Sequence, residues 1–351
     1  GGKPMETAAV IDTATGKTLW QTPYSESWQY TNVYGPGPRT APMIDGDLLF
    51  CQSATGVLAC ISLKSGKLIW SKQYSKDYGA KWFGGNAPGS SGTAASRHGN
   101  NGAPVTDAKH IYAAAGGHKG ASLVCLEKST GKLVWKSGND YAAYAGLMLG
   151  KLAGVEQVVY VTAANMKGYR AVDGKELWSV PVKTGAARNI VTPILQGDTV
   201  TVASHTVGTF QVRIRNSGDG QTAEPVWSNK DVKTNITTPV LKDGYLYGLG
   251  SSRGKNSDFV CLNHKTGELV WSEGGYDDYA SVIGLGDALL VHGSRGVVTL
   301  LKATPKAYTE LGRIEAASQL TWNFPVYSNG VLYIKDGLRD GGNKLTALKL
   351  Q

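Results

Sequence analysis

Short apolar segments alternate with glycine-containing polar turns along the whole chain. The clearest unit is an apolar strand, a polar turn that ends in glycine, and a tryptophan four residues after that glycine. Such regular punctuation predicts β-strands joined by tight turns. Five copies keep the four-residue step, and their glycine and tryptophan pairs are Gly16 and Trp20, Gly66 and Trp70, Gly131 and Trp135, Gly174 and Trp178, and Gly267 and Trp271.

Three further copies of this unit are altered. One has a longer turn and ends at Trp227, whereas those at 297–302 and 344–350 keep the strand without a tryptophan. The spacings between successive tryptophans are 50, 65, 43, 49 and 44 residues. Periods of this length are typical of the blades of a β-propeller.

A second pattern precedes most copies: a proline, a short apolar strand, a tight turn and another strand. It starts at Pro42, Pro239 and Pro325, with Asp-Gly or Asn-Gly at the turn. These dipeptides between apolar runs indicate β-hairpins, because both central residues of the favoured turn need positive φ. One period therefore holds four strands, which we name A to D from the inside outward. The sequence predicts an all-β fold, a single β-propeller domain (1–351) of four-stranded antiparallel blades.

The number of blades follows from the strands of type C. Eight such strands favour eight blades, although the first copy lacks strands A and B and the last lacks strand D. An open ring would expose unpaired strand edges. We expect eight blades with an incomplete first blade, and the alternative is seven blades in which the terminal halves merge.

The repeated tryptophans are expected to be structural. A blade cannot bury both of its faces alone, so a large ring packed against the next blade is needed. This role is assigned to Trp20, Trp70, Trp135, Trp178, Trp227 and Trp271.

The composition narrows the class of protein. Hydrophobic residues make up 41% and charged residues 18%, which is typical of a globular chain. No apolar run reaches the ~20 residues of a membrane span. The net charge is +9, but the lysines and arginines are scattered among turns. We therefore expect no nucleic-acid partner. The protein is expected to be a monomer.

Three of the four cysteines, Cys60, Cys125 and Cys261, occupy the same place in strand C and are expected in the core. If the preceding turn centres on Thr55 and Gly56, Cys51 lies directly opposite Cys60. Two interpretations stay open there, a cross-strand disulfide and a pair of buried thiols.

Catalytic and metal motifs are not evident. The six histidines lack metal-ligand spacing, and no nucleophile motif is present. The segment 74–103, between strand D of one blade and strand A of the next, is longer than a blade requires. Long loops in compact folds are often functional, so Trp82, Arg97 and His98 are candidates for recognition.

A binding site is expected where the D-to-A connections converge around the propeller axis. Arginine, asparagine and aromatic side chains there would suit a polar, ring-containing ligand. The alternative is that the asparagines only cap turns. The predicted ligand-binding residues are Arg39, Asn101, Tyr144, Asn189, Asn235, Tyr279 and Trp322.

The repeat resembles the PQQ-like propeller family, which includes quinoprotein alcohol dehydrogenases and the outer-membrane assembly lipoprotein B. The segments 35–42 (GPGPRTAP), 54–70, 224–227 (EPVW) and 303–311 (ATPKAYTEL) are similar to a bacterial polyvinyl-alcohol-dehydrogenase-like subgroup. For enzyme members the resemblance implies pyrroloquinoline quinone, Ca²⁺ and a carboxylate base. Residues for these roles cannot be placed here, and no catalytic residue is assigned.

Together these observations favour a non-catalytic binding or scaffold propeller of the bacterial cell envelope. It would recognise a protein, glycan or small molecule at its central funnel, without a metal or other cofactor. The alternative is a PQQ- and Ca-dependent quinoprotein alcohol dehydrogenase. We expect a periplasmic, cell-envelope or secreted protein whose leader was removed before residue 1.

Overall fold

The computed structural model describes most of the chain. The described residues are 3–27, 37–80, 99–234, 236–250, 257–277, 279–317, 321–336 and 344–350. The predicted loop residues Trp82, Arg97 and His98, and the predicted ligand residue Asn235, lie outside them.

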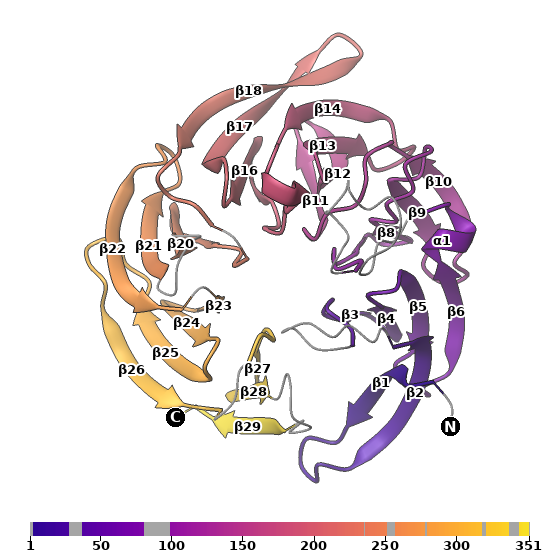
Figure 1. Ribbon diagram of the computed structural model, residues 1–351, viewed down its shortest axis with the longest axis horizontal. Coiled ribbons are helices and arrows are strands. Elements are labelled where there is room, and N and C mark those ends of the chain that lie inside the picture. Colours follow the sequence, from indigo (N-terminus) through magenta and orange to yellow (C-terminus); the bar gives the residue numbers. More distant parts are fainter. Residues whose placement is uncertain are drawn as a thin grey trace. The chain divides into compact units, whose positions relative to one another are not determined.

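The described chain is built almost entirely of antiparallel strands that pair in the order of the sequence (Figure 1). Three four-stranded sheets are β3 (Met43–Asp45), β4 (Leu48–Gln52), β5 (Val57–Ser62) and β6 (Leu68–Gln73); β7 (Val105–Thr106), β8 (His110–Ala113), β9 (Leu123–Glu127) and β10 (Leu133–Ser137); and β11 (Met148–Leu152), β12 (Val155–Val161), β13 (Asn165–Arg170) and β14 (Glu176–Pro181).

Three more four-stranded sheets follow. They are β15 (Ile194–Gln196), β16 (Thr199–Ser204), β17 (Gly208–Ser217) and β18 (Gly220–Asn229); β19 (Val240–Lys242), β20 (Tyr245–Leu249), β21 (Ser257–Asn263) and β22 (Leu269–Tyr276); and β23 (Ala280–Leu285), β24 (Ala288–Gly293), β25 (Val297–Lys302) and β26 (Glu310–Glu315). Among the described residues, the short helix α1 (Tyr74–Asp77) and the 3₁₀ turn η3 (Gly185–Ala187) lie in connections between strands.

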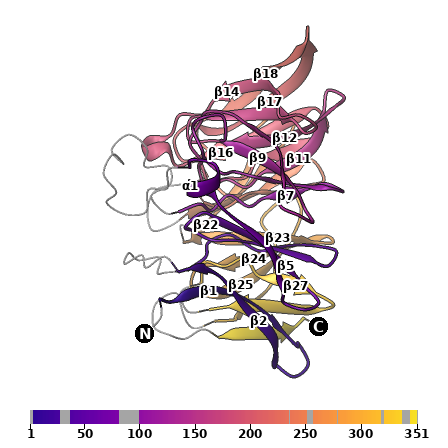
Figure 2. The ribbon, with the colours of Figure 1, turned by 90° about the vertical axis from the view of Figure 1, so that its right-hand side faces the viewer.

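Near the ends of the chain the sheets are smaller. β27 (Val326–Ser328), β28 (Val331–Lys335) and β29 (Leu345–Lys349) form a three-stranded sheet, and β1 (Met5–Ile11) pairs only with β2 (Thr18–Glu26). Figure 2 shows β1 and β2 running side by side.

The expected count of eight blades is wrong, because the structure has seven. Six blades have four strands, and the sheet β27–β29 is the seventh. β1 and β2 form only a hairpin, with no inner strands among the described residues. The sequence count used strands of type C, so it counted this hairpin as a blade. The all-β propeller class with four-stranded antiparallel blades is confirmed.

The chain forms two compact units. The first comprises the described residues up to 200 together with 213–224, and the second comprises 201–212 and the described residues from 225 onward. In the first unit β7 contacts β11 and β11 contacts β15, and in the second β19 contacts β23. Within each unit, neighbouring sheets thus meet at their first strands. That the whole chain, 1–351, is one domain stays a prediction.

Each of three sheets has one cross-strand rung of an aromatic residue, a cysteine and a tryptophan. In the first, Cys60 lies between Phe50 on β4 and Trp70 on β6, and the two rings are 6.0 Å apart. The small cysteine lets the flanking rings approach over it. The same rung recurs as Tyr112, Cys125 and Trp135, and as Tyr247, Cys261 and Trp271.

The predicted pairing of Cys51 with Cys60 is wrong by one residue. Cys51 lies opposite Ala59, so the two cysteines face opposite sides of their sheet. The cause is the turn: Ser53 N donates to Val57 O, which makes a three-residue loop that ends at Gly56 with φ 80°. Burial raises the pKa of the Cys51 thiol to about 11 and that of Cys60 to about 12. Both cysteines are free thiols.

Neighbouring sheets are joined by an indole that lies on a glycine. Trp70 Nε1 donates to Lys128 O at 2.8 Å, and a Cβ at Gly131 would lie 2.7 Å from the Trp70 ring. The ring therefore occupies the space where any other residue has its side chain. We call this contact, an indole ring on a glycine of the neighbouring sheet, the glycine seat. The same contact is made by Trp20 with Leu63 O and Gly66, by Trp135 with Ala171 O and Gly174, and by Trp227 with His264 O and Gly267.

Trp178 departs from this arrangement. Its indole donates to Gln157 Oε1 at 2.7 Å in its own sheet, and Gln157 Nε2 donates to Gln221 Oε1 at 2.7 Å. Gln221 belongs to the hairpin of β17 and β18, which have ten residues each and a turn without the glycine–tryptophan step. An amide pair thus replaces the glycine seat where the repeat is interrupted.

The contribution of the glycine seat to stability can be tested by comparing two glycines at the same motif position. Gly16 and Gly131 both have positive φ, 71° and 68°, but nothing lies within 4 Å of a Cβ at Gly16. Gly16→Ala should lower the free energy of unfolding by about 1 kcal/mol through backbone strain alone. Gly131→Ala should cost about 1–3 kcal/mol more, because the methyl group overlaps the Trp70 ring. Urea denaturation measures both, and equal losses would contradict the seat.

Candidate functional site

In the first unit, the segments that precede the A strands are hydrogen-bonded to one another. Leu147 N donates to Ala103 O at 3.0 Å, and Tyr144 N donates to Asn189 O at 2.9 Å. Gln52, whose side chain is buried, donates to Asn100 O and Gly102 O at 3.2 and 3.0 Å. The stretches that carry the predicted residues Asn101, Tyr144 and Asn189 therefore lie beside one another. Arg39 precedes Thr40, whose Oγ1 is 3.5 Å from Asn100 O.

The four predicted residues of this unit differ in what they offer a ligand. Asn189 is 2% exposed, and its Nδ2 donates to Thr162 O at 2.8 Å and to Val182 O at 3.0 Å. Its amide thus holds nearby backbone in place. Tyr144 is also buried, whereas Arg39 and Asn101 are half-buried. Arg39 and Asn101 are therefore the two of these four residues that keep part of their surface exposed.

In the second unit, the predicted residues Tyr279 and Trp322 stack on each other. Their ring centroids are 5.2 Å apart with an interplanar angle of 15°. Tyr279 Oη donates to Trp322 O at 3.0 Å and also lies 2.8 Å from Ser281 Oγ. Burial raises the pKa of Tyr279, which stays a neutral phenol. Tyr279 thereby supports Trp322, which keeps part of its surface exposed.

The seven predicted ligand residues thus divide into four in the first unit, two in the second and Asn235 outside the described residues. A ligand site formed by all seven stays a prediction.

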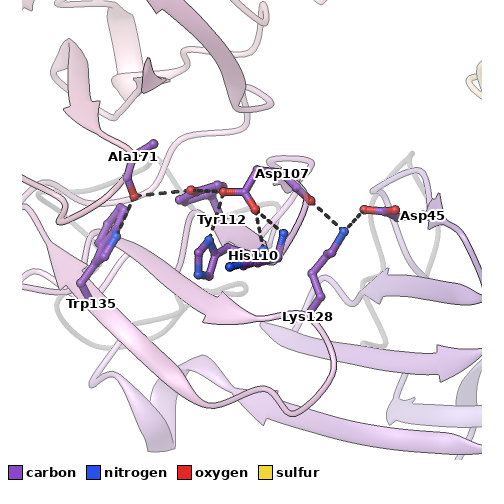
Figure 3. A network of polar contacts seen from close by, with 8 residues as sticks. Asp45, Asp107, His110, Tyr112, Lys128, Trp135 and Ala171 are labelled. Carbon is purple, nitrogen blue, oxygen red and sulfur yellow. Dashed lines mark hydrogen bonds and ion pairs between the residues drawn. The ribbon is translucent and has the colours of Figure 1, made fainter. Parts of the chain in front are cut away.

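A polar network at the A–B and C–D turns of the first unit was not foreseen (Figure 3). Lys128 Nζ donates to Asp45 Oδ2 at 2.5 Å and to Asp107 O at 2.7 Å. Asp107 Oδ2 accepts from Tyr112 Oη at 2.7 Å and lies 3.0 Å from His110 Nδ1. Asp107 Oδ1 accepts from two backbone N–H groups of its own turn.

The electrostatics of this network assign it a structural role. Partial burial opposes ionisation of Asp107, but the hydrogen bonds from Tyr112 and His110 outweigh it and lower the pKa of the carboxyl to about 2. Burial and the hydrogen bond to Asp107 raise the pKa of Tyr112 far above its usual range. Tyr112 Oη also approaches Ala171 O of the next sheet at 3.4 Å. A carboxylate so strongly stabilised is a poor base, and it instead connects three consecutive sheets.

A metal site and a ligand pocket are the two remaining kinds of functional feature. No group of three or more His, Cys, Asp or Glu side chains gathers as a metal site within the described ranges. An open hollow of about 710 Å³ lies in the second unit, lined by Tyr245, Asn263, Glu268, Leu269, Val270, Pro305 and Lys306. Sequence reasoning missed it, although the departure of 303–311 from the glycine–tryptophan step marks its position. None of the described helices is long and apolar enough to cross a bilayer.

The Asp107 network predicts a pH-dependent contribution to stability. The pKa of Asp107 is about 2 in the folded protein, below its value in the unfolded chain, so its contribution is complete above about pH 4–5 and disappears as the pH falls through 2. Asp107→Asn should therefore lower the free energy of unfolding at pH 7 and have a progressively smaller effect toward pH 2.

Urea titrations at pH 7, 4 and 2.5 measure this loss. Asp231→Asn, at an exposed position with no ion pair in the described structure, is the control and should show a small effect at every pH. A difference for Asp107→Asn that stays constant with pH would contradict the ionic contribution.

The chain was compared with known sequences and solved structures. No curated protein sequence matches it. Among solved structures, the crystal structure of BamB from Moraxella catarrhalis is 13% identical with a TM-score of 0.65, covering 95% of this chain and 89% of that one. The computationally designed Ika8 protein is 11% identical with a TM-score of 0.67, covering 99% and 92%. A quinohemoprotein alcohol dehydrogenase from Pseudomonas putida HK5 is 13% identical with a TM-score of 0.47, covering 94% and 59%.

The resemblance inferred from the glycine–tryptophan repeat is confirmed at the level of sequence. The profile of the family described as outer membrane protein assembly factor BamB matches residues 4–273, well over half of the chain. The chain therefore belongs to the BamB family of PQQ-like β-propellers.

Proposed function

We propose that this protein is a non-catalytic scaffold of the bacterial cell envelope that binds a protein partner. The observation that carries the proposal is the match of residues 4–273 to a family described as an outer membrane protein assembly factor. An assembly factor acts through contacts with other proteins. The same description supports a location at the envelope.

The geometry of the first unit supports a binding face at the D-to-A connections. These segments are hydrogen-bonded to one another, so their backbone is ordered before a partner arrives. Pre-ordering reduces the entropy lost on binding. Arg39 and Asn101 offer a guanidinium and an amide on that row, and arginine is enriched at the centres of protein interfaces.

The binding face can be located by photocrosslinking in cells. A benzoylphenylalanine residue placed at position 39 or 101 should yield a discrete crosslinked protein, because both side chains lie on the proposed face. The same group at Leu311, an exposed residue of β26, should yield none. Arg39→Ala should weaken capture from position 101 while the Tm stays near that of the wild type. Adducts at all three positions, or at position 311 alone, would contradict the proposal.

The quinoprotein alternative is tested independently. The protein is incubated with pyrroloquinoline quinone and Ca²⁺, dialysed, and examined by visible spectroscopy. We expect no retained quinone absorbance, because a face used for a protein partner has no need of a redox group. Stoichiometric quinone that is released by a Ca²⁺ chelator would instead support the dehydrogenase function.

A further inference from the structure

The outer strands β6 and β22 share one framework and carry opposite charges. Each is the last strand of its sheet, so one backbone edge has no neighbouring strand among the described residues. The sequence at β6 is Lys67-Leu-Ile-Trp-Ser-Lys72, and the sequence at β22 is Glu268-Leu-Val-Trp-Ser-Glu273. The two sequences match at the apolar pair, the tryptophan and the serine, whereas both lysines are replaced by glutamates.

A β-bulge places the two lysines on the same face of their sheet. Lys72 lies opposite Leu58 and Trp70 opposite Cys60, but Leu68 lies opposite Ile61, so Ile69 is an extra residue. The backbone of Lys67 is bonded to Ser62. Side chains alternate along a regular strand, and the extra residue restores Lys67 to the face of Lys72.

The same bulge acts on β22. Glu273 lies opposite Phe259 and Trp271 opposite Cys261, and a shift follows between Cys261 and Leu262. Glu268 is bonded through its backbone to Asn263. Glu268 and Glu273 therefore share one face with the same spacing as the lysines. When the two free edges are set side by side with the strands antiparallel, all four charged side chains lie on one face of the joined sheet, so that Lys67 meets Glu273 and Lys72 meets Glu268.

Exposed apolar side chains lie between these charges. Leu68 and Ile69 are 40% and 42% exposed, and Leu269 and Val270 are 48% and 42% exposed. Glu268, Leu269 and Val270 also line the hollow of about 710 Å³. The hollow has room for an aliphatic side chain from the opposing strand. Unpaired strand edges with exposed apolar residues are templates for pairing with another chain.

We propose that the β6 edge of one copy of this protein docks onto the β22 edge of a second copy. The contact is head-to-tail, because two different edges meet, and it therefore permits assemblies larger than a dimer. It is a weak association, since exposed ion pairs contribute little each and the net charge of +9 opposes it. This inference is independent of the partner proposed above, and it differs from the monomer expected from the sequence.

Sedimentation equilibrium over a wide range of protein concentration tests the contact. The wild type should self-associate, and both K67E/K72E and E268K/E273K should weaken self-association about tenfold or more, because two attractions become repulsions. K67E/K72E also lowers the net charge from +9 to +5. General repulsion would then decrease, so a non-specific electrostatic effect predicts the opposite result for this variant.

Mixing the two charge-reversed variants is the decisive experiment. An equimolar mixture of K67E/K72E and E268K/E273K should associate again, because each variant retains an edge complementary to the other. Thermal melts of all variants verify that they are folded.

β10 supplies a matched control. Its lysines flank a similar apolar pair, but Lys136 lies opposite Val124 whereas Trp135 lies opposite Cys125, and Lys132 is bonded to Glu127. Lys132 and Lys136 therefore face opposite sides of the sheet and cannot both meet the two glutamates. K132E/K136E should change self-association less than about twofold.

Three results would overturn the proposal. These are a wild type that stays monomeric at millimolar concentration, a mixture that fails to associate, and a β10 variant as impaired as the β6 variant.

Discussion

The contact of an indole with a bare glycine holds neighbouring blades together, and much else in the structure depends on it. At Gly131 the Trp70 ring lies where a Cβ would be, only 2.7 Å away, so the position admits no side chain. The indole N–H is bonded to Lys128 O, which removes the penalty of burying a polar group. Where a blade keeps the four-residue step from glycine to tryptophan, its turn contacts one neighbour and its ring contacts the other.

This contact explains why the fold could be inferred from the sequence while the number of blades could not. The glycine, the tryptophan and the hairpin turns are local features, and each imposes a definite backbone geometry. The blade count depends instead on which strands pair, and β1 and β2 satisfy the local pattern without forming a blade. The cysteine register failed for a related reason: a three-residue loop ending at Gly56 and a two-residue turn look alike in the sequence, but they shift the pairing by one residue.

The proximity of the connecting segments in the first unit was predictable from the sequence, but the environment of their side chains was not. The segments before the A strands do lie side by side in the first unit, as strand order required. Which of their side chains keep exposed surface is decided by tertiary contacts. The Asn189 amide donates hydrogen bonds to Thr162 O and Val182 O, whereas the Arg39 side chain keeps part of its surface exposed. The Asp107 network could not be foreseen either, because Lys128 and Ala171 reach it from other blades or turns.

The glycine seat has a consequence for how such a chain can change over evolutionary time. Its receiving surface consists of a backbone carbonyl and the absence of a side chain, so it recognises no particular partner sequence. Any blade that carries the tryptophan fits any blade that carries the turn, and a duplicated or exchanged blade would find a neighbour without compensating substitutions. Residues outside the seat are then free to diverge, as the lysines of β6 and the glutamates of β22 have done around the same Leu-(Ile/Val)-Trp core. The joint at Trp178, which needs the matched amides of Gln157 and Gln221, instead ties two particular blades to each other.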